Sequence, residues 1–286
     1  MNINRLVIAN PAGNVTGIVF DRIHQCSHAV VAEAIQNRYP EVEQVIFAQR
    51  RSGIIHGQMA GGEFCANAAR SLGYIMNAGR EDVIEISMSG TPHPVVVATK
   101  PGYAAMTMTT NADVEKKDWR GGTVPIVHFE GITHALIYPS HPQATSLSGG
   151  NKTDIHQALR ELGIHERLAS GLIFATPMPQ DWRIKPYVFV RNTGTICAET
   201  ACASASSALA LHQNSSIRVL QPSGKKLAIT LHQGDGQHKI SVGGIIRILW
   251  DSASDDITLR DYAPDARPTK YPPGPKPARF TRNTLP

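Results

Sequence analysis

The fold of this chain is constrained above all by a motif that occurs twice, once in each half. Residues 58–77 contain a glycine pair, an acidic residue, Cys65 and then small residues that run into an apolar segment. Residues 195–210 repeat the order of an acidic residue, Cys202 and small residues that run into an Ala/Leu-rich segment. Two such sites about half a chain length apart predict a duplicated fold in which both cysteines face one cleft.

Cys65 is expected at the N-terminus of a helix. The residues after it are small helix formers, and Leu72 and Ile75 follow at helical spacing. The unpaired N–H groups and the dipole at a helix N-terminus favour anions, so the pKa of a thiol there is expected below its ordinary value of about 8.5. A carboxylate can bind beside the thiol for the same reason. The motif therefore indicates chemistry on an acid.

The composition favours a globular protein with a substantial core. The chain has 286 residues, of which 42% are hydrophobic and 18% charged, enough for one large or two ordinary domains. It contains no apolar run of membrane-spanning length, and residues 1–8 are typical of a first strand rather than a signal peptide. Four cysteines are too few for a disulfide scaffold. We expect a cytoplasmic protein.

The net charge of +5 comes from the C-terminal tail. Residues 266–286 contain five basic residues and no acid: Arg267, Lys270, Lys276, Arg279 and Arg282. The remaining chain is balanced in charge, and aromatic residues make up only 6%, so neither a nucleic-acid partner nor a stacking surface for single strands is indicated. The tail is rich in proline and is expected to be extended.

The pattern of strands and helices predicts an α+β fold of two pseudo-symmetric halves, residues 1–118 and 119–262, followed by the tail 263–286. In each half a mostly antiparallel sheet is expected to wrap around one central helix, the helix that follows the cysteine. The polar stretch 111–122 is interpreted as the crossing between halves. Gly243 and Gly244, within the last long strand, predict a bulge or a close approach of backbone.

Other chemistries fit the cysteines less well. A single cysteine followed by alanines is usually a small buried residue, but two matched sites favour function, whereas Cys26 and Cys197 keep the structural interpretation. The chain has no Cys-x-x-Cys or His-Glu-x-x-His spacing, so no metal is expected. A cysteine hydrolase using His134 or His56 would leave the second motif unexplained. No glycine-rich nucleotide motif occurs, so no cofactor is expected.

Four motifs in order resemble the diaminopimelate-epimerase-like, cofactor-independent amino-acid racemases. The residues around Cys65 and Cys202 look like the family motifs Cys-Gly-Asn-Gly and Cys-Gly-Ser/Thr-Gly, with alanine at Ala66 and Ala203 where the family has glycine. Residues 11–14, Pro-Ala-Gly-Asn, are similar to Gly-Leu-Gly-Asn, and residues 131–134 to Gly-Asn-Pro-His. The Gly-Gly-Glu-Phe-Cys form of the first motif is closest to the histidine racemases of opine-metallophore pathways.

The resemblance implies roles for individual residues. Cys65 and Cys202 would act as base and acid on opposite faces of the substrate Cα, without pyridoxal phosphate or any other cofactor. Glu199 is the preferred ligand of the substrate ammonium, and Glu63 is interpreted as a helix cap. The remaining substrate-binding positions that the motifs imply are Asn14, His56, Ala66, Asn67, His134, Thr193, Ala203 and Ser204.

The substrate is expected to be an amino acid smaller than diaminopimelate. At the family positions that hold a second amino-acid head group, this chain has His56, Ile132 and Thr193, so the charged partners are missing. Burying an unpartnered head group costs several kcal/mol. Histidine is therefore the leading candidate, and diaminobutyrate, diaminopimelate, an isomerase like those of phenazine biosynthesis and a non-catalytic amino-acid-binding protein stay open. The expected partner is this small molecule, with no nucleic acid and no membrane; a homodimer stays open.

Overall fold

The computed structural model describes residues 2–232, 238–252 and 257–258. Within them the protein is a mixed α+β fold made mostly of strands, with five α-helices, which confirms the expected class at this level. The predicted tail, residues 263–286, lies outside the described residues. No helix in the described part of the chain is long and apolar enough to cross a membrane.

The elements of the first half run from the N-terminus to Thr110. They are β1 (Asn2–Ile3), β2 (Leu6–Asn10), β3 (Thr16–Val19), the 3-10 turn η1 (Gln25–Ser27), α1 (His28–Arg38), β4 (Gln44–Arg51), β5 (Ile54–Met59), α2 (Ala66–Met76), β6 (Asp82–Met88), β7 (Val95–Lys100) and β8 (Tyr103–Thr110).

The elements of the second half follow directly. They are β9 (Asp113–Trp119), β10 (Gly122–His128), β11 (Thr133–Ile137), α3 (Ala144–Ser148), α4 (Lys152–Glu161), β12 (Ala169–Pro177), β13 (Trp182–Val190), β14 (Thr195–Ala198), α5 (Ala203–Gln213), β15 (Ile217–Leu220), β16 (Lys226–His232), β17 (His238–Ile245), β18 (Arg247–Asp251) and β19 (Ile257–Thr258).

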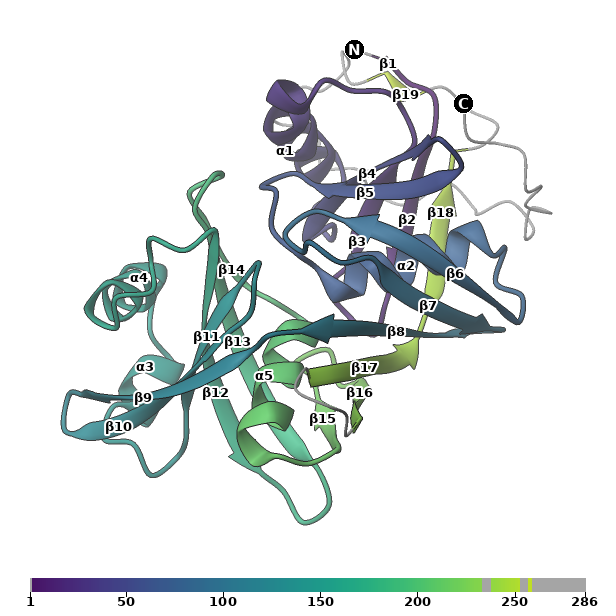
Figure 1. The fold of residues 1–286 in the computed structure, drawn as a ribbon. Helices are drawn as coiled ribbons and strands as arrows, with labels where there is room; N and C mark the ends of the chain where they lie inside the picture. Colours follow the sequence, from purple (N-terminus) through teal and green to yellow (C-terminus); the bar gives the residue numbers. More distant parts are fainter. Residues whose placement is uncertain (1, 233–237, 253–256, 259–286) are drawn as a thin grey trace.

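The strands pair in the same order in both halves. From β2 to β8 the successive pairs are antiparallel, parallel, antiparallel, parallel, antiparallel and antiparallel. From β10 to β13 and then β15 to β17 the same six pair types recur. β8 and β17 pair antiparallel, so one continuous sheet passes from one half into the other (Figure 1).

Two strands lie differently from the sequence expectation. The stretch 111–122 contains β9, which pairs with β10, where the sequence predicted only a crossing. The residues of β9 are mostly exposed, so polar side chains are tolerated there and the strand shows no hydrophobic pattern in the sequence. β18, near the end of the described chain, pairs with β2 of the first half.

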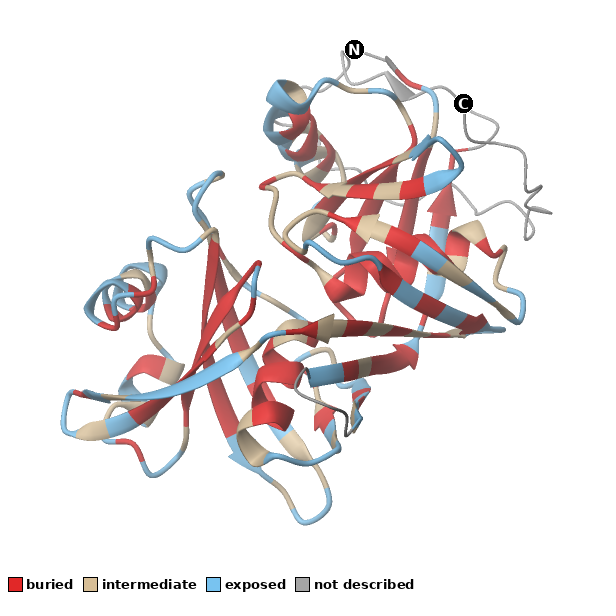
Figure 2. Ribbon diagram, viewed as in Figure 1, coloured by how far each residue is buried: buried red, intermediate tan, exposed pale blue. Residues whose placement is uncertain are grey.

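Helices α2 and α5 occupy the centres of the two halves. α2 contacts β3, β4, β6, β7 and β8, and α5 contacts β10, β11, β12, β16 and β17. Nearly all their residues are buried (Figure 2). α1 and α4 instead contact β4 and β12 respectively (Figure 1). The small residues after each cysteine permit this enclosure: at Gly73, a Cβ would lie 2.6 Å from Val97 Cβ.

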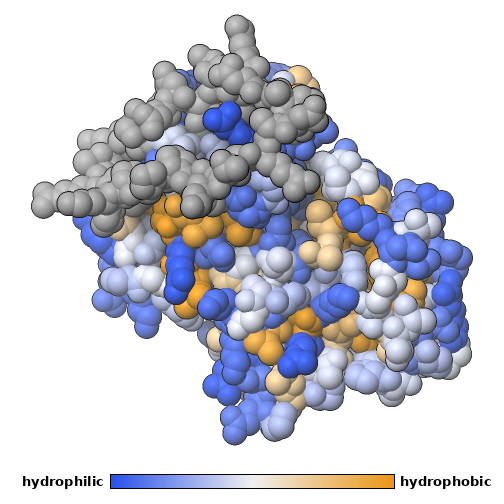
Figure 3. Space-filling view, turned by 180° about the vertical axis from the view of Figure 1, so that it is seen from behind, coloured by the Kyte–Doolittle hydropathy of each residue, from blue (hydrophilic) through white to orange (hydrophobic). Residues whose placement is uncertain are grey.

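The described surface is mainly hydrophilic with apolar residues among the polar ones. Seen from behind, apolar side chains form patches separated by hydrophilic ones (Figure 3). Val30 and Val83, 69% and 63% exposed, belong to different elements. Scattered exposure of this kind is usual and needs no special explanation.

Candidate active site

The two cysteines occupy equivalent backbone positions. Cys65 is the N-cap of α2 with φ −134° and ψ 111°, and Cys202 is the N-cap of α5 with φ −129° and ψ 106°. The expectation that Cys65 sits at a helix N-terminus is confirmed, and Cys202 matches it. Each thiol therefore lies beside the first backbone N–H groups of a buried helix, a place suited to binding a carboxylate, and Cys65 Sγ accepts from Ala68 N at 3.5 Å.

Two asparagines connect the halves next to Cys202. The side-chain Nδ2 atoms of Asn14 and Asn67 donate to the carbonyl of Ala201 at 2.9 and 3.1 Å. Asn14 has φ +54°, within the turn predicted at residues 11–14. Its backbone N–H donates to Thr200 Oγ1 at 2.7 Å. The residue before Cys202 is thereby held by both the N-terminal turn and the first turn of α2.

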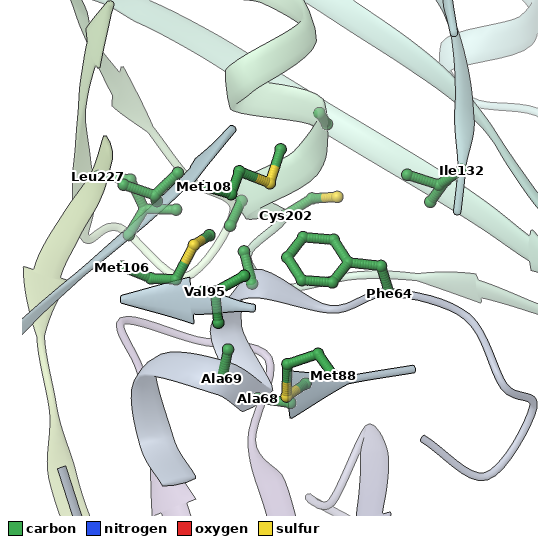
Figure 4. Packing of buried hydrophobic residues seen from close by; sticks show 14 of the residues in the cluster. Phe64, Ala68, Ala69, Met88, Val95, Met106, Met108, Ile132, Cys202 and Leu227 are labelled. Atoms are coloured by element: carbon green, nitrogen blue, oxygen red, sulfur yellow. The ribbon is translucent and has the colours of Figure 1, made fainter. Parts of the chain in front are cut away.

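The packing around Cys202 also comes from both halves. Cys202 belongs to the same buried cluster as Phe64, from the loop that carries Cys65, and as Met106 and Met108 of β8. Figure 4 shows the Cys202 side chain beside the Phe64 ring. Ile132 joins this cluster from the second half. The second cysteine thus belongs to a core that both halves of the chain build.

His134 is linked to Cys202 through Ser204. Its Nε2 lies 2.9 Å from Ser204 Oγ, which in turn lies 3.4 Å from Cys202 Sγ. Burial lowers the pKa of His134 to about 3, so the imidazole is neutral at physiological pH. The Nδ1 atom has no hydrogen-bond partner among the described residues. His134 and Ser204, both selected from sequence, therefore form one chain of contacts to the thiol.

The thiols are less acidic than their helix positions alone suggest. Burial, followed by the charge of Glu199, raises the pKa of Cys65 to about 12, and the same two causes raise the pKa of Cys202. The sequence expectation of a lowered thiol pKa was wrong, because desolvation and nearby carboxylates outweigh the helix N-terminus.

Carboxylates gather near the cysteines. Burial raises the pKa of Glu199 to about 7, against a smaller lowering by hydrogen bonding to the Cys202 thiol. Burial also raises the pKa of Glu63, whose Oε2 atom has no hydrogen-bond partner within the described chain. The Oδ1 atom of Asn14, a residue 1% exposed, is likewise unpartnered there. The site thus offers acceptors that a bound ammonium would satisfy.

A cleft of about 400 Å³ lies between the halves beside these carboxylates. Its walls come from α1, the start of β4, the loop before Cys65, the end of β13 and β14. Among the lining residues are four acids and no lysine or arginine: Glu33, Glu43, Glu63 and Glu199. Its volume lies in the range of pockets that hold small molecules, and its charge favours a group that donates hydrogen bonds or is cationic.

The predicted site residues are only partly brought together, and neither Cys65 nor Cys202 is among the residues that line this cleft. Ala66 and Ala203 follow the two N-caps and are buried, and Thr193 lines the cleft. His56 does not line it; it lies on β5 between Ile55 and Gly57, which face the core. Ile132 is packed inside the cluster around Phe64. Of His56, Ile132 and Thr193, the three residues expected to form the wall, Thr193 lines the cleft, together with residues of α1 and β14.

Sequence reasoning missed several residues of the site. Gln44 lines the cleft and donates to Thr16 Oγ1 at 2.8 Å, and Gln221 Oε1 accepts from the backbone N–H of Cys202 at 2.9 Å. Glu43 accepts from Thr200 N at 2.8 Å. Each is a single polar residue at a strand end, and no spacing to a cysteine marks it in the sequence.

Comparison with known proteins decides the family. A family described as the histidine racemase CntK N-terminal domain matches residues 5–251. The chain belongs to this family. A histidine racemase from Fusobacterium nucleatum subsp. nucleatum (strain ATCC 23726) is 27% identical over 233 residues, covering 75% of this chain and 85% of the relative. The histidine racemase of strain ATCC 25586 is 26% identical over 75% and 84%.

Solved structures show the fold of this histidine racemase family member. A phenazine biosynthesis protein of the PhzF family from Bacillus anthracis aligns with a TM-score of 0.64 and 12% identity, covering 90% of this chain and 99% of that one. A predicted epimerase from Pseudomonas aeruginosa aligns with a TM-score of 0.61 and 12% identity over 86% and 97%. The resemblance found in the motifs is thereby confirmed, and the family membership suggests an isomerase.

Proposed function

We propose that this protein is a cofactor-independent histidine racemase in which Cys65 and Cys202 act on opposite faces of Cα. The observation that carries the proposal is the pair of thiols at equivalent N-caps of two buried central helices. A two-base racemase needs one thiolate and one thiol facing each other across the substrate. The repeated strand order supports such a two-fold arrangement.

The proton transfers balance within the pair. One cysteine, as thiolate, takes the Cα proton and becomes a thiol; the other, as thiol, gives its proton to the opposite face and becomes the thiolate. The negative charge that develops on the substrate carboxylate lies beside the first N–H groups of α2 and α5, which stabilise it. The raised thiol pKa makes the thiolate a stronger base toward a weakly acidic carbon.

Glu199 is proposed to bind the substrate ammonium, with Asn14 Oδ1 as a second acceptor. Because the charge of Glu199 raises the pKa of both cysteines, an ammonium paired with it lowers the cost of forming a thiolate. Substrate binding would thus make it easier for a cysteine to form the thiolate that acts as the base. His134, neutral and linked through Ser204, is proposed to orient the Cys202 thiol.

The acidic cleft supports histidine over diaminopimelate. Glu63 and Glu199 line the cleft, and we place the substrate side chain in it, where a second substrate carboxylate would meet like charges. An imidazole ring donates from its N–H groups and gains from these acceptors, most when protonated. Diaminobutyrate carries a cationic side chain and is the second candidate that the same cleft favours.

We also propose that the two structural units differ slightly from the sequence boundaries. The pairing of β9 with β10 and of β18 with β2 supports a first unit of residues 2–112 and 247–251 and a second unit of residues 113–245. The cleft then lies between the units. A metallophore precursor as the product, and a cytoplasmic location, follow from the family resemblance and belong to the same proposal.

The test is a panel of L-amino acids incubated with the protein in deuterated water. Loss of the α-proton signal and formation of the D-enantiomer are expected with histidine and not with meso-diaminopimelate. Cys65→Ala and Cys202→Ala should each lower racemisation roughly 10³-fold or more. Cys26→Ala, which replaces an exposed free cysteine, is the control and should retain activity.

Each outcome is decisive. Exchange with diaminopimelate but not histidine would refute the substrate. Near wild-type racemisation by Cys65→Ala would refute the two-thiol mechanism. Exchange with no amino acid, together with saturable binding of histidine, would support the amino-acid-binding protein instead.

A further inference from the structure

Arg70 is fully buried in α2 and is not used by the mechanism above. Its guanidinium donates to four neutral oxygens: Nε to Ala104 O at 3.0 Å, Nη1 to Asn67 Oδ1 at 3.0 Å and Pro11 O at 3.5 Å, and Nη2 to Ile245 O at 3.4 Å. A buried cation held by neutral acceptors is costly to keep. Such a group invites a functional explanation.

The oxygens that Arg70 contacts mark the places where the halves meet. Ala104 and Ile245 lie on β8 and β17, the strand pair that joins the halves. Pro11 begins the turn that carries Asn14. Gly244 leaves the necessary space, because a Cβ there would lie 2.9 Å from Arg70 Nη2; the close approach predicted from the Gly243–Gly244 pair is confirmed at this contact. One side chain from α2 thus connects three segments.

The contact with Asn67 fixes the orientation of its amide. Arginine only donates hydrogen bonds, so the Asn67 atom facing Arg70 must be the carbonyl oxygen Oδ1. The Nδ2 group then faces the Ala201 carbonyl, to which it donates at 3.1 Å. Both polar atoms of Asn67 are used, and the residue is 1% exposed. Its side chain therefore ties the halves together and is not free to bind substrate, unlike Asn14, whose Oδ1 stays unpartnered among the described residues.

We propose that Arg70 is a positioning residue that sets the Cys202 loop relative to Cys65 through the Asn67 amide. Asn67 lies in the first turn of the helix capped by Cys65, and Ala201 directly precedes Cys202. The path from one thiol-bearing backbone to the other therefore contains a single side chain, and Arg70 holds that side chain in its donating orientation. The inference rests on the proposed two-thiol racemisation.

The test compares two substitutions with a matched control. Arg70→Lys keeps the positive charge but loses the branched guanidinium group, which donates to Asn67 and to the strand oxygens at the same time. Asn67→Asp keeps the partner of Arg70 but puts a carboxylate oxygen against Ala201 O. Thr107→Val removes a different hydrogen bond between β8 and β17, Thr107 Oγ1 to Ser241 Oγ at 2.6 Å, and leaves the Asn67 amide untouched.

Both test variants should lower kcat for histidine racemisation roughly 10- to 100-fold, with KM within about twofold because neither side chain is placed against the substrate. Inversion should fall more than α-proton exchange with retention in deuterated water, since exchange needs one thiol and inversion needs both. Thr107→Val should change neither kcat nor the ratio of inversion to exchange. Hydrogen exchange of residues 200–203 should accelerate in both test variants, whether or not histidine is the substrate.

These measurements test the positioning role of Arg70 separately from the proposed racemase function. If the wild-type protein racemises nothing but the segment 200–203 loosens in both variants, the positioning stands and the proposed function fails. If both variants keep the wild-type ratio of inversion to exchange and the wild-type hydrogen exchange, the role of Arg70 is refuted. Equal losses of inversion and exchange, matching the loss of folded protein, would make Arg70 only a structural residue and would also refute it.

Discussion

In the proposed mechanism, the charge of the Glu199 carboxylate controls how readily the cysteine thiols lose their protons. After burial, its charge is the largest cause that raises the pKa of Cys65, Cys197 and Cys202. Its own pKa is raised to about 7 by burial. Without substrate, ionised Glu199 opposes thiolate formation; with an ammonium bound, that opposition is relieved. In the proposed mechanism the same carboxylate would therefore serve both substrate binding and base activation.

Glu199→Gln should alter the pH dependence of stability. The folded pKa of about 7 lies above the unfolded value of about 4.5, so the folded state binds the proton more tightly and wild-type stability falls as pH rises through this window. The variant should match wild type below about pH 4.5 and exceed it by about 1–3 kcal/mol above pH 7. Urea unfolding at several pH values measures this difference; Glu33→Gln, on the exposed face of α1, is the control. A difference that does not vary with pH would contradict the assignment.

At the scale of elements, the central helices depend on small residues that let them pack closely against the surrounding strands. α2 approaches β7 so closely that a Cβ on Gly73 would lie 2.5 Å from Val97 Cγ1 and 2.6 Å from its Cβ. The small residues that follow the cysteine are thus needed for a helix enclosed on all sides, in addition to forming the N-terminus beside the thiol. The candidate site and the packing of α2 therefore both require small residues after Cys65.

Gly73→Ala should separate helix propensity from packing. Propensity alone would stabilise the helix by about 1 kcal/mol, whereas the added methyl group meets the Val97 side chain and should cost a net 1–3 kcal/mol, roughly. Gly149→Ala, where no atom lies within 4 Å, is the matched control and should be neutral or slightly stabilising. Thermal unfolding of the three proteins decides the sign. A stabilised Gly73→Ala protein would show that α2 can move away from β7.

At the scale of the whole molecule, the site exists only where the halves meet. Asn14 and Asn67 of the first half hold the loop of Cys202, and Asn192 of the second half donates to Gly61 O at 2.8 Å near Cys65. The continuous sheet through β8 and β17 adds a further connection. Motions that separate the halves would therefore open the cleft and misplace the thiols together.

Deletion of residues 266–286 should leave the body intact. From sequence, this segment carries the whole net charge of +5 and little apolar matter, so it adds little to a hydrophobic core. The shortened protein is expected to keep its Tm within about 2 °C and to turn over substrate at a similar rate. Differential scanning calorimetry measures the first and the racemisation assay the second. A large loss of Tm would show that the segment packs on the body or on another subunit.

Features that depend on local pattern could be predicted before the fold was known. The two cysteine motifs with their small residues predicted the N-caps of α2 and α5, because helix starts and enclosure are encoded within about ten neighbouring positions. Gly243 and Gly244 predicted a close approach, since only glycine leaves such space. The order of the motifs was enough to indicate the family.

Features that depend on distant partners became visible only in the folded chain. The acidic cleft draws Glu33 and Glu199 from opposite halves, and no spacing links them. The Arg70–Asn67–Ala201 contacts join α2 to a loop more than a hundred residues away. The direction of the thiol pKa shifts was also beyond the motif, because a helix N-terminus is a local property whereas desolvation and neighbouring carboxylates arise only when the chain has folded around the site.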